Sequence, residues 1–276
     1  MDVADGGRAR ILTWNLWWRF GPDWRRRQPG IRHTLSELDP DVVATQETWG
    51  DRNTSQAHEL AGHLGFHAAY AGPSLPPRPA EPESADQLGI DIGLGLVSRW
   101  PITSAHVVPT PSPHRAEAPV ALVAAVAHPA GALPVVVACL EFEPAYNDDR
   151  AAQARAVFEL ASDAALDGAL PVILAGDFNA TAGSPVLRPL RDFLIDTWEA
   201  GGGDPQAVTV PSSHPQAPVE AVELIDQRID HVFLRPGQPG QRITVHDARI
   251  VDPVVDGVHP SDHRPVVVDA SWTNTR

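Results

Sequence analysis

The stretch VILAGDFN, residues 172–179, decides the fold of this chain. Its four leading apolar residues indicate a buried strand, and that strand ends in Asp177 and Asn179. A carboxylate at the end of a buried strand is costly unless a metal ion, a cation or hydrogen bonds compensate for it. A single aspartate at the end of a strand can also have a purely structural role, because an aspartate can cap a turn. Its meaning therefore depends on whether other strands end in the same way.

Four further polar clusters lie directly beside apolar runs. They are Trp14-Asn15 after residues 11–12, Gln46-Glu47 after residues 42–44, Ile229-Asp230-His231 before residues 232–234, and Ser261-Asp262-His263 before residues 266–268. Their polar side chains are mainly acids, amides and imidazoles. Five such clusters along one chain predict a single polar site at which the strand ends converge.

Outside these clusters the chain alternates short apolar runs with helical stretches, which predicts an α/β fold. Strands are predicted over residues 11–17, 41–46, 94–98, 119–127, 134–140, 172–175, 229–234, 243–251 and 265–270. Helices are predicted over residues 31–38, ended by Asp39-Pro40, and over residues 148–166, stopped by Gly168.

Two stretches rich in proline and glycine, residues 72–89 and 201–218, interrupt this pattern. They are expected to be long surface loops, either as mobile insertions or as a rim that faces the substrate. The polar clusters fall in both halves of the chain, and no linker separates two folding units. We therefore expect a single domain over residues 1–276, with a core at about 10–270.

The composition is that of a soluble globular protein, with 43% hydrophobic residues and a mean hydropathy of −0.17. No stretch approaches the ~20 consecutive apolar residues of a membrane helix, so membrane insertion is not expected. The N-terminal residues lack the apolar stretch of a secretory signal, and the single cysteine, Cys139, excludes an internal disulfide. These features predict a cytoplasmic protein.

The net charge of −14 results from 21 basic and 35 acidic residues, and all of the basic ones are arginines. An acidic protein repels a polyanion at long range, which disfavours nonspecific binding of duplex DNA. A phosphate substrate is still compatible with this charge, because a bound divalent cation inverts the local field.

Taken in order, the motifs resemble those of the endonuclease/exonuclease/phosphatase superfamily, which has the DNase I-like fold. The resemblance covers residues 11–268 and rests on WN at 14–15, PDVV at 40–43, QE at 46–47, GLVSRWPI at 95–102, RAAQ at 150–153, GDFN at 176–179, RID at 228–230 and SDHRP at 261–265. It implies an α/β (α+β) four-layer αββα sandwich, in which two mixed sheets pack face to face under outer helices. It also implies metal-dependent hydrolysis of a phosphoester.

The resemblance places a divalent cation, Mg²⁺ or Mn²⁺, at Glu47. Carboxylate oxygen is the type of ligand that these ions prefer. Asn15 would add an amide oxygen or hold Glu47 through a hydrogen bond. Asp262 would be a second ligand or lie just outside the ligand set.

The resemblance also assigns four residues to the phosphate chemistry. Asp177 would orient or deprotonate the attacking water, and Asn179 would donate to the phosphoryl oxygens, since the two lie at i and i+2 and face the same way on an extended segment. His263 would contact the scissile phosphate, and Asp230 would accept a hydrogen bond from it and hold its orientation.

Cys139 departs from the family pattern. The family commonly has a Thr-His-Leu run before the Arg-x-x-Gln helix, and residues 138–140 here read Ala-Cys-Leu. Cys139 is therefore a candidate substrate contact in the place of a phosphate-contacting histidine. It is interpreted either as a thiolate or, more simply, as a small buried thiol. A neutral thiol is a weak donor, so a weaker or differently specialised hydrolase is expected.

The substrate is open, because this fold hosts several. A phosphodiesterase or nuclease of limited range, acting on a nucleic acid or a nucleotide, agrees best with the acidic charge. A phospholipid or inositol-phosphate hydrolase and a degenerate, non-catalytic binding protein on the same scaffold are the alternatives. Tryptophans at positions 14, 17, 18 and 24 lie next to Asn15 and either stack on a substrate base or pack in the core.

Overall fold

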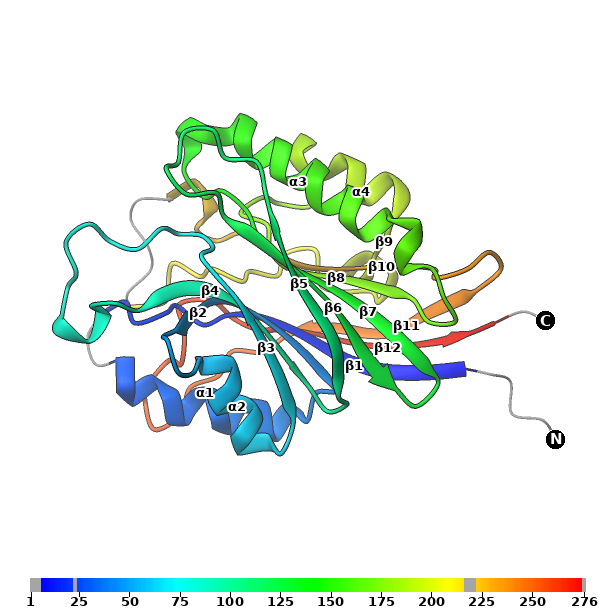
Figure 1. Ribbon diagram of the computed structural model, residues 1–276, viewed down its shortest axis with the longest axis horizontal. Coiled ribbons are helices and arrows are strands. Elements are labelled where there is room, and N and C mark those ends of the chain that lie inside the picture. Colours follow the sequence, from blue (N-terminus) through cyan, green and yellow to red (C-terminus); the bar gives the residue numbers. More distant parts are fainter. Residues whose placement is uncertain (1–5, 22–23, 216–221, 275–276) are drawn as a thin grey trace.

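Two mixed β-sheets form the centre of the computed structural model, which describes residues 6–21, 24–215 and 222–274 (Figure 1). The first sheet has the order β11-β12-β1-β2-β4-β3 and the second the order β5-β6-β7-β8-β10-β9. The strands of the first are β1 (Gly6–Asn15), β2 (Val42–Gly50), β3 (His67–Ala71), β4 (Asp91–Ser98), β11 (Arg242–Ile250) and β12 (Val266–Thr273). Those of the second are β5 (Ile102–Pro109), β6 (Val120–His128), β7 (Gly131–Cys139), β8 (Val172–Asp177), β9 (Ile195–Asp196) and β10 (Asp230–Arg235).

Helices cover both outer faces of the pair of sheets, which confirms the four-layer arrangement (Figure 1). The first sheet carries α1 (Trp24–Leu38) and α2 (Gln56–Leu64), and the second carries α3 (Asn147–Ser162) and α4 (Arg188–Phe193). The remaining helices are α5 (Thr197–Ala200) and five short 3-10 turns, η1 (Ala85–Gln87), η2 (Pro144–Tyr146), η3 (Ala164–Leu166), η4 (Pro185–Leu187) and η5 (Val222–Leu224). None of the helices in the described ranges is long and apolar enough to cross a membrane.

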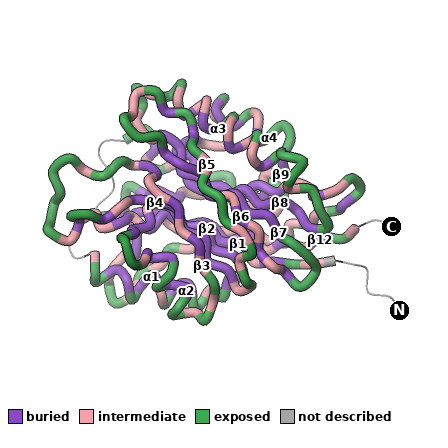
Figure 2. Tube along the Cα trace, in the orientation of Figure 1, coloured by how far each residue is buried: buried purple, intermediate pink, exposed green. Residues whose placement is uncertain are grey.

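Alternate residues of the central strands face the other sheet or the helices, so these strands are buried on both sides, whereas the edge strand β5 is largely exposed (Figure 2). Ile11 packs between the sheets with Val268 and Ile173, whereas the next residue, Leu12, packs with Leu35 on the helical side. The core between the sheets draws on both halves of the chain.

Most predicted element boundaries differ from the structure by one to four residues, and three differ in ways that matter for the fold. The helix predicted over 148–166 ends at Ser162, because Asp163 is extended and its carboxylate caps the separate turn η3 through Ala165 N–H. The helix predicted over 31–38 starts at Trp24 and contains Pro29. The strand predicted over 11–17 ends at Asn15, because Trp17 has a left-handed backbone with φ of 56°.

The two predicted loops lie largely where they were expected. Residues 72–90 join β3 to β4 with only the short turn η1, and the stretch after α5 has no regular element up to residue 215. The last residues of the loop predicted over 201–218 lie outside the described residues.

Candidate active site

At one end of the second sheet the core between the sheets changes from apolar to polar within one row of residues. In the middle of this sheet, Ala175 of β8 and its strand neighbours are buried and apolar. The next row on the same face consists of Cys139, Asp177 and Asp230. A row of this kind places two carboxylates and a thiol side by side at the edge of the core.

The first sheet contributes Asn15 and Glu47 to the same end. Asn15 is the last residue of β1 and pairs with Gln46 of β2. The pairing of β2 with β4 shifts register between Thr45 and Thr48, and Glu47 has a left-handed backbone with φ of 47°. A bulge of this kind re-aims a side chain, and here it brings Glu47 to the Asn15 side chain.

Asn15 connects the carboxylates of the two sheets. Its Nδ2 donates to Glu47 Oε1 at 2.8 Å and to Asp177 Oδ2 at 3.1 Å. Its Oδ1 accepts from Trp17 N–H at 2.9 Å, which sets the orientation of the amide. The amide thus turns its NH₂ group to the acids and commits its oxygen to the backbone. This geometry favours the second of its two expected roles, which is to hold Glu47.

His263 lies between two aspartates of the second sheet. Its Nδ1 is 2.9 Å from Asp230 Oδ2, and its Nε2 is 4.0 Å from Asp177 Oδ2. The segment that carries it is tied to β1, because Ser261 Oγ donates to Asn15 O at 2.6 Å and Trp14 Nε1 donates to His263 O at 2.9 Å. The imidazole is therefore held from both sheets.

Asn179 lies beside Asp177, but not on an extended segment. Its backbone is left-handed with φ of 47°, its N–H donates to Asp177 Oδ1, and its Nδ2 donates to Leu140 O at 2.8 Å. The expectation that the two side chains align along a strand is therefore wrong, because the chain turns after β8. The Asn179 amide has a second N–H, which leaves it able to donate to a substrate.

The two remaining predicted residues also lie at this end. Asp262 is buried and accepts from Ser261 Oγ at 3.3 Å. Cys139 is buried beside Asp177 in the adjacent strand. Burial, together with the nearby charges of Asp177 and Glu47, holds the pKa of the Cys139 thiol well above its usual value. Cys139 is thus a neutral thiol, as its simpler interpretation requires.

Burial, together with the charge of a neighbouring acid at Glu47 and Asp177, raises the pKa values of the acids of the site. Burial and the Asp262 charge raise the pKa of Glu47 to about 8. Burial and the Asp230 charge raise the pKa of Asp177 to about 7, and burial also raises the pKa of Asp262. Burial lowers the pKa of His263, but the surrounding aspartates outweigh it and raise that pKa well above its usual value. A site of this charge has a need for a cation.

We expect the stability of the metal-free protein to fall on the order of 2 kcal/mol between pH 6.5 and 8. In this range folded Glu47, Asp177 and His263 retain protons that they lose in the unfolded chain. Stability from a raised pKa is present below the unfolded pKa and is lost as the pH rises through the folded one. Urea unfolding in the presence of a chelator measures this loss, and constant or rising stability would contradict it.

A matched variant separates this effect from other titrations. Glu47→Gln removes one of the raised pKa values, so its stability should fall less over the same range. The buried histidines with lowered pKa values, His128, His214 and His231, contribute mainly at lower pH, since the unfolded imidazole titrates near ~6.5. If the stability of the variant falls as much with pH as that of the wild type, Glu47 does not contribute to the effect.

The arrangement has counterparts among known proteins. A family model described as "Endonuclease/Exonuclease/phosphatase family" matches residues 12–263. The chain belongs to this family. Members of the endonuclease/exonuclease/phosphatase family are phosphoester hydrolases.

Solved structures of the family share the fold. D. rerio TDP2 humanized by 14 mutations has a TM-score of 0.73 at 19% identity, over 97% of this chain and 99% of that one. The human Nocturnin catalytic domain with bound sulfate anion has a TM-score of 0.71 at 18% sequence identity, over 99% of this chain and 97% of that one. D. rerio TDP2 complexed with single strand DNA product has a TM-score of 0.69 at 17% sequence identity, over 95% of this chain and 98% of that one. A search of curated proteins returns no match.

Sequence reasoning missed a buried arginine behind the candidate site. Arg27 of α1 is 2% exposed and holds the backbone on two sides of the acids. Burial lowers its pKa to about 10, which leaves it charged at neutral pH. Its guanidinium donates, at 3.0–3.1 Å, to the carbonyl oxygens of Leu16, Trp17, Trp18, Phe20 and Pro260. Trp17 and Trp18 both have positive φ, so Arg27 stabilises a strained turn directly after Asn15.

Arg150 of α3 binds backbone carbonyl groups beside the second sheet in the same way. It is buried, and its guanidinium donates to the carbonyl oxygens of Glu141, Phe142, Glu143 and Asn179 at 2.6–3.3 Å. Arg150 belongs to the RAAQ motif, so a sequence signal for it existed. Arg27 has no such signal, because Pro260 is 233 residues away in the sequence.

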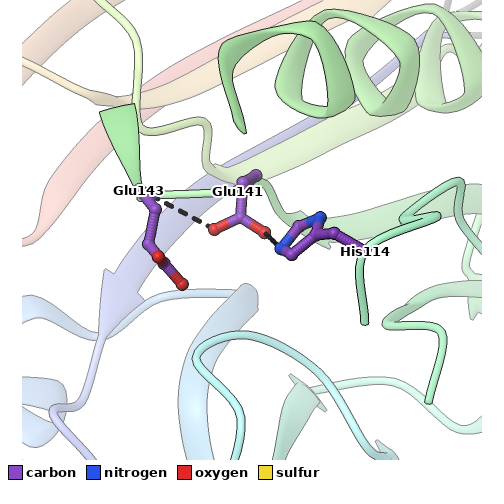
Figure 3. Close-up of side chains that lie close together, drawn as sticks. All are labelled: His114, Glu141 and Glu143. Atoms are coloured by element: carbon purple, nitrogen blue, oxygen red, sulfur yellow. Dashed lines mark hydrogen bonds and ion pairs between the residues drawn. The ribbon is translucent and has the colours of Figure 1, made fainter. Parts of the chain in front are cut away.

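A second group of possible metal ligands, His114, Glu141 and Glu143, lies apart from the acid row (Figure 3). Arg115 already donates to both of these carboxylates, with Nη2 2.7 Å from Glu141 Oε1 and 3.0 Å from Glu143 Oε1. A metal ion here would have to displace a charged guanidinium. Arg115 thus already balances the charge of this group, and the other group of possible metal ligands consists of Asp177, Asp230 and His263.

The tryptophans near Asn15 pack mainly in the core. Trp14 and Trp18 are fully buried, and Trp18 contacts the cluster of Trp49, Ile90 and Ile92. Trp17 is partly exposed and lies 4.5 Å from the Arg27 guanidinium. The packing interpretation is confirmed for Trp14 and Trp18.

Proposed function

We propose that this protein is a metal-dependent phosphoester hydrolase, and more specifically a phosphodiesterase or nuclease of limited range. The observation that carries the proposal is the placement of His263 between Asp230 at 2.9 Å and Asp177 at 4.0 Å, next to the Asn15–Glu47 pair. Such a set joins a charged imidazole to a carboxylate that can accept a proton. Both are needed to cleave a phosphoester with water.

The metal would be held by Glu47, with Asp262 nearby and Asn15 fixing the Glu47 carboxylate. The residues fit Mg²⁺ or Mn²⁺, because their oxygen atoms are of the right type and because burial raises the pKa of both carboxyl groups. When bound, the ion would screen the phosphate and polarise its oxygens.

The remaining steps are assigned to the chain's own side chains. Asp177 accepts a proton from the attacking water and orients it, with its own position set by Asn15 and by Asn179 N–H. His263, protonated beside Asp230, donates from Nε2 to the phosphate or to the leaving oxygen. Asn179 donates its second amide N–H to a phosphoryl oxygen.

The proposal is tested by hydrolysis of a panel of phosphoesters, each with Mg²⁺, with Mn²⁺ and with a chelator. Metal-dependent turnover of phosphodiesters supports it. Turnover restricted to phospholipids or inositol phosphates would favour that alternative. Absence of turnover on every substrate, together with an absence of metal binding, would favour a binding protein on the same scaffold.

We expect Glu47→Gln to weaken Mg²⁺ binding at least ten-fold, because the amide keeps the size of the side chain and loses the charge. Wild-type protein should gain thermal stability with millimolar Mg²⁺ or Mn²⁺, and the variant should gain little. Calorimetric titration measures both affinities. Glu143→Gln, an acid that pairs with Arg115, is the matched control and should respond as the wild type does.

We expect Cys139→His to raise kcat on simple phosphodiesters by about ten- to a hundred-fold. A neutral thiol lacks one charge-assisted hydrogen bond of roughly 1.5–3 kcal/mol, and the imidazole would supply it beside Asp177. Cys139 is 3% exposed, so the larger ring also costs packing and should lower the melting temperature. Unchanged activity with an ordered imidazole in the site would show that another group fills this role.

A further inference from the structure

The structure contains a groove of about 720 Å³ whose lining residues lie outside the acid row. It is lined by Trp18, by the loop from Pro77 to Gly89, by residues 114–117, and by Glu143 and Tyr146. Two of these walls are joined to the site. Trp18 N–H donates to Glu47 O at 2.8 Å, and Arg150 binds the carbonyls of both Glu143 and Asn179. The volume is in the range of small-molecule pockets, roughly 300–1,000 Å³.

One wall of the groove carries a stacked pair of rings. The His114 and Tyr146 rings are 3.4 Å apart between centroids and lie within 8° of parallel. His114 Nδ1 is 2.5 Å from Asp149 Oδ2, and its Nε2 is 3.5 Å from Glu141 Oε2 on the other side (Figure 3). The Asp149 carboxylate at Nδ1 restrains the imidazole, so the pair forms a fixed flat surface on which another ring can stack.

The charges of the groove cancel, which argues against a polyphosphate ligand. Two arginines and two glutamates line it. Arg115 is paired with Glu141 and Glu143, and Arg78 Nη1 is 3.4 Å from Asp91 Oδ1. An inositol polyphosphate or a duplex would require surplus cations, and a chain of net charge −14 offers none here.

The apolar surface of the groove is too broken for an acyl chain. Leu88 is 65% exposed and prolines stand near it, but Arg78, Gln87 and Glu117 interrupt them. A lipid tail requires a continuous apolar surface. A flat ring with polar edges suits the groove better, because it can stack on the ring pair and exchange hydrogen bonds with the polar side chains.

We propose that this groove binds a nucleobase attached to the scissile phosphate. The substrate would then be a nucleotide phosphodiester or the end of a single strand, with the base stacked on the Tyr146–His114 pair. This inference rests on the proposed phosphodiesterase function and names its substrate class.

The test compares two esters that release the same leaving group, thymidine 5′-(4-nitrophenyl phosphate) and methyl 4-nitrophenyl phosphate. With Mg²⁺ or Mn²⁺, kcat/KM of the wild type should be at least ten-fold higher for the thymidine ester. Tyr146→Ala should reduce that preference about ten-fold through KM, whereas Tyr146→Phe should retain it. Phe193→Ala, which removes an exposed ring on α4 outside the groove, is the matched control.

Equal kcat/KM for the two esters in the wild type would overturn the inference, as would an equal loss on both in Tyr146→Ala. If the wild type hydrolyses neither ester, the proposed function fails and the groove is judged by calorimetric binding of thymidine 5′-monophosphate. Binding that Tyr146→Ala abolishes supports the inference, and no binding to the wild type overturns it. Comparing the dinucleotide TpT with a ten-residue oligothymidylate distinguishes a small nucleotide from a strand.

Discussion

Asp177→Asn is expected to lower kcat by about three orders of magnitude with little change in fold. The amide has the same shape, and its single oxygen can keep one of the two hydrogen bonds that the carboxylate accepts, from Asn15 Nδ2 at Oδ2 and from Asn179 N–H at Oδ1. It cannot take a proton from water, and it removes a negative charge that faces His263. Loss of a positioned general base typically costs 10²–10⁴-fold. Steady-state kinetics at saturating metal, with circular dichroism as the check on folding, measure the effect.

Asp41→Asn is the matched control for this variant. Asp41 precedes β2 at the opposite end of the strand from Glu47, and it pairs with Arg99 at 2.7 Å. Its loss should leave turnover unchanged at a small cost in stability. A loss of less than about ten-fold in Asp177→Asn would mean that another group activates the water.

Asp230→Asn is expected to have an effect of similar size, about 10²–10⁴-fold on kcat. The carboxylate is fully buried and accepts from His263 Nδ1, and an amide in its place favours the wrong tautomer. It also removes one of the charges that raise the pKa of His263 against the effect of burial. If protonated His263 is the active form, the variant should lose activity at a lower pH than the wild type.

The double variant Asp230→Asn/His263→Ala tests whether the pair acts as a unit. Residues that act together show strongly non-additive losses. The double variant should therefore be no slower than His263→Ala alone. Losses that multiply would show that Asp230 acts independently of the imidazole, through Asp177 or through the fold.

Strands buried on both faces could be predicted from the sequence, because a short continuous apolar run such as residues 172–175 indicates a fully buried strand. The edge strand β3, with the sequence HAAYA, is only partly buried and contains no such run. Its strand conformation therefore depends on the neighbouring strand with which it pairs, and not on a local sequence pattern. The helix α2 had a local signal that was overlooked. Ser55 caps its start by accepting from His58 N–H, and Gly65 ends it with φ of 72°.

The membership of the site could be predicted from the order of its motifs, but its geometry could not. Glu47 and Asn179 both need a left-handed backbone to reach their positions. A non-glycine residue adopts that conformation when tertiary contacts stabilise it, and no local pattern reports those contacts. Arg27 shows the same limit, because its acceptors lie in two segments far apart in the sequence.

Arg27 and Arg150 hold main-chain carbonyls, an acceptor that every residue type provides. Side chains in residues 16–20 and 141–143 can therefore be exchanged without removing the bonds that shape these turns. Evolution could thus alter the surroundings of the acids while the acids stay in place. A library randomised at the partly exposed positions 17, 19, 20, 142 and 143 of these two turns, with both arginines kept, should yield a high share of folded enzymes with new substrate preferences.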